Sequence, residues 1–68
     1  MNKNALIEIV EGIVEAADEL LEKEDRDLVE QGELIAYAES LSIIRDACSG
    51  YDLAEIGLDF DIDARYLN

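Results

Sequence analysis

The stretch from Asp27 to Ser49 constrains the fold more than any other part of the chain, because its apolar residues surround much of a helix. A charged run, Glu22 to Arg26, precedes it, and Gly50 follows it. Asp25 or Asp27 can accept hydrogen bonds from the first free backbone N–H groups of a helix, and Gly50 can adopt the left-handed conformation that ends one. We therefore predict a helix over residues 27–49.

The apolar residues of this helix form two main faces when each residue is turned by about 100° from the one before. The first face follows a 3-4-3-4 spacing and consists of Leu34, Tyr37, Leu41, Ile44 and Cys48. The second face consists of Val29, Ala36, Ile43 and Ala47. A helix that is apolar on most sides is buried on most sides. One neighbouring helix cannot cover both faces, so we expect a further cover, either the C-terminal residues or another copy of the chain.

Small side chains recur along the same helix, with Gly32, Ala36 and Ser40 four residues apart. Such a row would let another backbone come close. Gly32 lowers helix propensity by roughly 1 kcal/mol relative to alanine, so packing would have to offset this cost. The alternative is that Gly32 marks a kink, or that the helix begins only at Glu33.

Residues 4–24 show the spacing of an amphipathic helix, which Asn2 or Asn4 can cap. Its apolar seam, spaced 4-3-4-3, consists of Leu6, Val10, Ile13, Ala17 and Leu20. Its acidic residues fall on the opposite side. The charged run that follows could continue a single bent helix through pairs such as Glu19–Lys23. We expect a short loop and an antiparallel hairpin instead, since an isolated long helix would leave both apolar surfaces in water.

After Gly50 the pattern changes. Residues 52–56 predict one helical turn, capped by Asp52 and stopped by Gly57. Residues 58–63 alternate apolar and acidic side chains, and we interpret them as an extended segment that presses Leu58, Phe60 and Ile62 onto the helices. Asp61 or Asp63 can cap a last short turn. We therefore predict an all-α single domain of residues 1–68, a two-helix antiparallel hairpin with a short C-terminal helical turn and an extended tail.

The chain is short enough to be marginally stable on its own, because domains of this size bury only about 60% of their unfolded surface. The single cysteine, Cys48, allows no internal disulfide, and we expect it to be a buried packing residue. Self-association would supply the missing burial. We therefore predict a homodimer with a four-helix arrangement. Its core and dimer interface would be the first face, namely Leu34, Tyr37, Leu41, Ile44 and Cys48.

The residues needed for most catalytic or metal-binding sites are absent. The chain has no histidine, no glycine-rich phosphate loop and no basic aromatic patch, so we expect neither an enzyme nor a cofactor. Asp59, Asp61 and Asp63 have the spacing that opens a calcium loop of the EF-hand type. Ala64 stands where that loop needs glycine, and the position of its final glutamate lies beyond residue 68. They are therefore weak metal candidates, and solvated acids are the better interpretation.

The net charge of −13 disfavours direct binding to nucleic acid and to anionic membranes. It favours basic partners, or it simply keeps the chain soluble. The charged N-terminal start does not resemble a signal peptide, and no apolar run approaches the length of a membrane span. We therefore expect a cytoplasmic protein.

One face of the first helix is the strongest functional candidate. This acidic ridge consists of Glu8, Glu11, Glu15, Asp18 and Glu22. Neighbours three and four residues apart on a helix lie about 5–6 Å from one another, comparable to the phosphates of a nucleic-acid strand. The first hypothesis is a binding module, or an inhibitor that imitates DNA, which offers the ridge to a basic nucleic-acid-binding protein. The second is a homo-oligomeric structural protein whose acidic ridge only solvates the helix. No motif decides between them.

Overall fold

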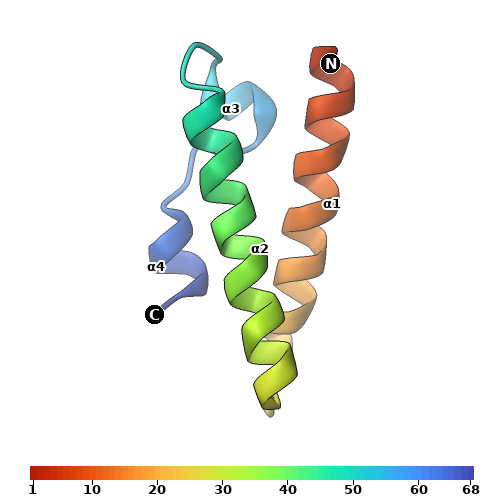
Figure 1. The fold of residues 1–68 in the computed structure, drawn as a ribbon, viewed down its shortest axis with the longest axis vertical. Helices are drawn as coiled ribbons and strands as arrows, with labels where there is room; N and C mark the ends of the chain where they lie inside the picture. The colour runs from red at the N-terminus through yellow and green to blue at the C-terminus, as the bar shows by residue number, and fades with distance from the viewer.

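Two long helices packed side by side form the frame of the molecule. A computed structural model describes all residues, 1–68, and contains α1 (Lys3–Glu22), α2 (Leu28–Ala47), α3 (Leu53–Ile56) and α4 (Ile62–Tyr66). In Figure 1, α1 descends from the N-terminus, α2 ascends beside it, and the C-terminal segment then runs back along α2. α3 contacts α1, and α4 contacts α2. The expectation of an all-helical chain with two long packed helices is confirmed.

α1 begins and ends through polar contacts made by residues near it in sequence. The side chain of Asn2 caps the helix and accepts a hydrogen bond from the backbone N–H of Ala5 at 2.8 Å. The helix ends at Glu22, two residues earlier than expected. There, Nη1 of Arg26 donates to the carbonyl oxygens of Leu20 and Lys23 at 3.1 and 3.2 Å, respectively. A cation satisfies the last carbonyls and complements the negative end of the helix dipole.

α2 begins with a capping box. The side chain of Asp27 accepts from the N–H of Glu30, while the side chain of Glu30 accepts from the N–H of Asp27. This reciprocal pair satisfies two of the free N–H groups at the start of the helix. The helix begins at Leu28 and runs through Gly32 without interruption, so the alternative that it begins only at Glu33 is wrong.

The end of α2 differs from the prediction. Gly50 does not adopt a left-handed conformation, because the only residue with positive φ is Gly57. The last turn closes through hydrogen bonds from the N–H of Cys48 to the carbonyls of Ile44 and Arg45. The N–H of Tyr51 then donates to the carbonyl of Cys48, and this turn redirects the chain. The expected role of Gly50 is therefore wrong.

The C-terminal segment follows the prediction more closely. Asp52 caps α3, and Gly57, at φ 84°, ends it in the left-handed region that favours glycine. The N–H of Leu58 donates to the carbonyl of Leu53 at 2.8 Å, which closes the turn. The chain then runs extended to Asp61, which caps α4. The expected tail thus ends in a second short helix.

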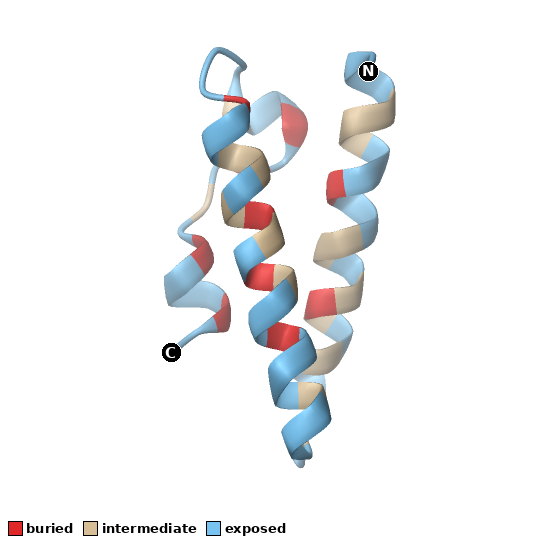
Figure 2. Ribbon diagram, viewed as in Figure 1, coloured by how far each residue is buried: buried red, intermediate tan, exposed pale blue.

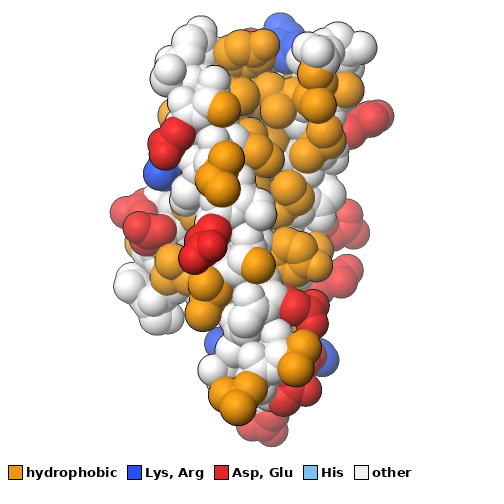
Figure 3. Space-filling model, in the orientation of Figure 1, with side chains coloured by type: hydrophobic (Ala, Val, Ile, Leu, Met, Phe, Trp, Pro, Cys, Tyr) orange, Lys and Arg blue, Asp and Glu red, His pale blue; other side chains and the backbone are white.

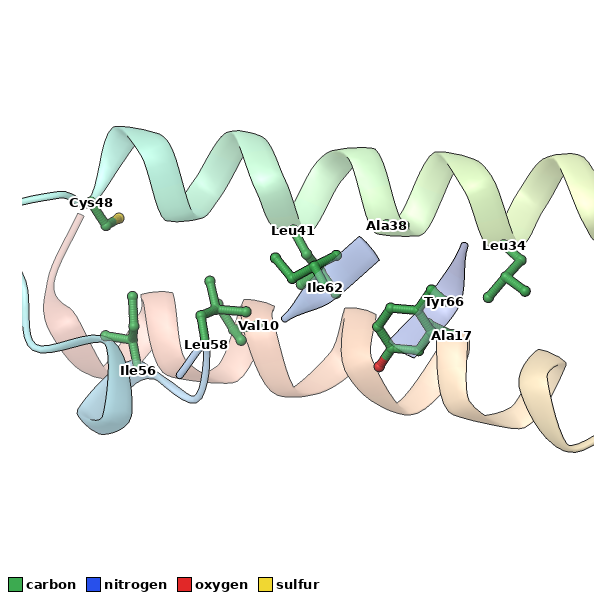
Figure 4. Packing of buried hydrophobic residues seen from close by; sticks show 10 residues of the cluster. All are labelled: Val10, Ala17, Leu34, Ala38, Leu41, Cys48, Ile56, Leu58, Ile62 and Tyr66. Atoms are coloured by element: carbon green, nitrogen blue, oxygen red, sulfur yellow. The ribbon is translucent and has the colours of Figure 1, made fainter. Parts of the chain in front are cut away.

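The core lies where the two long helices meet the C-terminal segment. Its ten buried residues are Val10, Ala17, Leu34, Ala38, Leu41, Cys48, Ile56, Leu58, Ile62 and Tyr66. Figure 4 shows Ile62 beside Leu41 of α2, with Leu58 next to Val10 of α1. Figure 2 shows the buried positions of α1 and α2 on their facing sides. Of the two covers considered for the first face of α2, the C-terminal segment is the one present.

Replacing Ile62 by alanine tests the contribution of this segment. Ile62 is fully buried, so Ile62→Ala should lower the free energy of unfolding by about 2–5 kcal/mol, through lost burial and the cavity left behind. The matched control is Leu28→Ala at a residue that is 85% exposed, where the change should stay within about 0.5 kcal/mol. Urea unfolding followed by circular dichroism measures both. Equal losses would contradict a core completed by α4.

Candidate functional site

The acidic ridge lies along one side of α1. Glu8, Glu11, Glu15 and Glu22 are exposed, and none of them is in an ion pair. The fifth member, Asp18, is only partly exposed. The structure therefore divides the predicted ridge into four carboxylates that face solvent and one that contacts the rest of the protein.

Asp18 anchors the C-terminal helix to α1. Its two carboxylate oxygens accept hydrogen bonds from Nη2 of Arg65 and from the hydroxyl of Tyr66, each at 2.8 Å. The guanidinium of Arg65 also lies 4.9 Å from the ring centre of Phe60, and the Phe60 and Tyr66 rings meet edge to face. Asp18, which was predicted as a ridge residue, thus holds the C-terminal helix with both of its carboxylate oxygens. In the sequence, this contact was indicated by Arg65, a basic residue next to the aromatic Tyr66 in an otherwise acidic C-terminal segment.

This anchor changes how Tyr66 titrates. Burial of the ring, together with the hydrogen bond to Asp18, raises the pKa of Tyr66 to about 12. The hydrogen bond with Asp18 also raises the pKa of Arg65. Both effects keep the two donors protonated, so the contact persists throughout the neutral pH range.

Every basic side chain has a partner within the chain. Lys3 pairs with Glu55 and Lys23 with Glu30, and these carboxylates raise the pKa values of both lysines. Arg26 binds carbonyls at the end of α1, and Arg65 binds Asp18. Arg45 lies 3.7 Å from Asp46. Because only four of the eighteen acidic residues are in these ion pairs, the surface field is strongly negative.

A shallow groove runs beside the ridge. Val10 and Val14 form its apolar part together with Gly57, and carboxylates of the ridge border it, among them Glu11 and Glu15. The aliphatic stem of a lysine or arginine can lie on such an apolar strip while its charged end reaches a carboxylate. The groove is thus suited chemically to long basic side chains.

The first face of α2 belongs mainly to the core of a single chain. Leu34, Leu41 and Cys48 are buried, while Tyr37 and Ile44 are partly buried against the same cluster. The buried three are core residues of the single chain, because α1 and the C-terminal segment cover them. Their place in a dimer interface stays a prediction. Cys48 is a free buried thiol.

Asp59, Asp61 and Asp63 are exposed and do not converge. The side chain of Asp61 is engaged as the cap of α4, where it accepts from the N–H of Ala64. No group of three or more histidine, cysteine or acidic side chains is arranged to hold a metal ion. No helix is both long enough and apolar enough to cross a bilayer.

Comparison with known proteins found no matching family model, no matching curated protein and no matching solved structure. The candidate site therefore rests on its own geometry.

The anchor at Asp18 predicts a specific dependence of stability on pH. At neutral pH, Tyr66→Phe should lower the free energy of unfolding by about 1–3 kcal/mol, because it removes a hydrogen bond to a carboxylate. The folded protein holds the Tyr66 proton more tightly than the unfolded chain, whose tyrosines titrate near 10. This contribution is therefore complete below about pH 10 and is lost as pH rises towards about 12.

Urea unfolding of wild type and Tyr66→Phe between pH 7 and 11.5 measures the difference. Both proteins share the lysine ion pairs, so their difference isolates Tyr66. A difference that stays constant up to pH 11.5 would contradict the proposed anchor.

Proposed function

We propose that this protein is a non-enzymatic binding module that presents the acidic ridge of α1 to the basic surface of a partner protein. One observation carries the proposal. Glu8, Glu11, Glu15 and Glu22 are exposed without an ion pair, while all five basic side chains are engaged by other groups of the chain, Arg65 among them by Asp18. An amphipathic helix needs a polar face to be solvated. Lysine or arginine residues would serve for that as well as glutamates, so solvation alone does not explain a purely acidic face.

The geometry of the ridge supports a partner that normally binds nucleic acid. Carboxylates at helical spacing form a row of negative charge about 5–6 Å apart, which a groove built for phosphates can accept. The groove beside the ridge offers apolar contact for long basic side chains. The negative field of the whole chain would speed the encounter with a basic partner. Such a protein would act as an inhibitor, because it occupies the site that the nucleic acid needs.

A second candidate function is favoured by a different observation. Several large apolar residues of α2 remain exposed, among them Val29 and Ile43. They favour a homo-oligomeric structural protein in which two antiparallel hairpins form a four-helix arrangement. In that case the ridge only solvates the assembly. Of the two, the ridge is the better supported, since the complete engagement of cations has no role in self-association.

Charge reversal on the ridge tests the proposal. The variant Glu11→Lys, Glu15→Lys, Glu22→Lys leaves Asp18 and its anchor intact, so helix content should not change. Immobilised wild-type protein should capture basic proteins from a cell extract, release them as salt rises, and lose them to added duplex DNA. The ridge variant should capture none of them.

The matched control moves the same three charge reversals away from the ridge. Glu39, Asp46 and Asp59 are exposed on α2 and the C-terminal segment, and their replacement by lysine produces the same net charge. This control should retain most of the capture. If both variants lose the same proteins equally, net charge rather than the ridge is responsible, and the proposal fails.

A further inference from the structure

One broad side of the α1–α2 pair is apolar and has no cover from the rest of the chain. Figure 3 shows hydrophobic side chains gathered over both long helices, and Figure 2 shows the same side as mostly exposed or half-buried. α3 lies on the far side of the pair in this view. We name this surface the open face. By helical rotation and exposure, its main residues are Ile9, Ile13 and Ala16 of α1 with Ala36, Ile43 and Ile44 of α2.

The open face is unusual because large apolar side chains on it are exposed to solvent. Ile43 is 69% exposed and Val29, at its lower end, is 71% exposed. The groove between the two helices is lined by Ala16, Leu20 and Tyr37 together with the charged side chains of Glu19, Lys23 and Glu33. Figure 3 shows the apolar patch along the junction of the two helices, with acidic side chains beside it on the same side. Contiguous exposed apolar surface of this kind marks an interaction site.

We propose that the open face is the docking surface for a second copy of this chain, which stacks on it to form a two-layer, four-helix dimer. This inference develops the second candidate function and is independent of the ridge. The molecule measures 37 × 20 × 15 Å, and the open face lies on its broadest side. A side of that size can supply an area on the order of the 800 Å² per partner that stable dimers bury. The other sides are narrower or are occupied by the C-terminal segment.

The sizes of the side chains on the open face are compatible with packing against a second copy. Its α1 half carries large side chains, Ile9 and Ile13, whereas the middle of its α2 half carries small ones, Ala36 and Ser40. A twofold axis through the face would place α1 of each copy over α2 of the other, so large residues would meet small ones in both halves of the interface. Ile43 would become buried, which removes the largest apolar exposure from the centre of the face.

Charge sets the conditions under which this dimer forms. Two chains of −13 repel each other, and the apolar face must overcome this repulsion. By helical rotation, Glu11 and Glu15 point away from Ile9, whereas Glu8 lies nearer the edge of the open face, so the dimer would keep most of each ridge outside the interface. Added salt screens the repulsion without weakening apolar contact, so the dimer should become tighter as salt rises. Binding at the ridge has the opposite salt dependence.

Sedimentation equilibrium between 0.05 and 1 M NaCl tests the proposal directly. We expect a species of twice the 7.6 kDa chain mass, with a dissociation constant that falls several-fold across this range. A mass of 7.6 kDa at high protein concentration in 1 M NaCl would overturn the proposal.

Single substitutions locate the interface. Ile43→Glu and Ala36→Glu each place a charge in the open face at residues that are exposed in the single chain, so both should restore the monomer mass while retaining the helical circular dichroism. The matched control is Ile35→Glu, at a residue that is 47% exposed on the side of α2 near Leu67. It should dimerise like wild type. Loss of the dimer in this control but not in Ile43→Glu would refute the assignment of the face.

The outcome separates this inference from the proposed ridge function. If the dimer forms and the ridge variant still captures the same partners, the open face is supported and the ridge function fails. If the chain stays monomeric while capture depends on Glu11, Glu15 and Glu22, the ridge function is supported and the open face fails.

Discussion

The fold depends on the insertion of the C-terminal segment against both long helices. Four of the ten buried residues, Ile56, Leu58, Ile62 and Tyr66, come from this segment. Two helices alone meet along a narrow line and would leave the first face of α2 largely in water. The segment converts that line into a core with three sides. The hydrogen bonds from Arg65 and Tyr66 to Asp18 then fix its last helix in place. Burial of apolar side chains drives the C-terminal segment onto the two helices, and the hydrogen bonds to Asp18 fix the position of α4 along α1.

The features that could be predicted from the sequence are those set by residues close together in the chain. The apolar spacing located both long helices, and the caps Asn2, Asp27, Asp52 and Asp61 act within three residues of themselves. The four exposed glutamates of the ridge follow from spacing alone for the same reason. Such predictions need no knowledge of what packs against the helix.

The features that could not be predicted depend on contacts between distant residues. Asp18 looks identical to its ridge neighbours in sequence, and its two partners lie 47 and 48 residues away. Gly50 and Gly57 both follow a helix, yet only Gly57 has positive φ, because the chain after α2 turns without a left-handed residue. The apolar spacing correctly identified the first face of α2. It could not show what covers this face, because that depends on the path of residues 58–66.

The late position of this anchor also bears on how the protein is made. During synthesis, α1 and α2 leave the ribosome before Ile62 and Tyr66 exist, and domains can fold only as their parts emerge. Until then the apolar side of α2 that these residues cover is open to water or to other chains. The native core therefore closes only after the chain has been translated through residue 66.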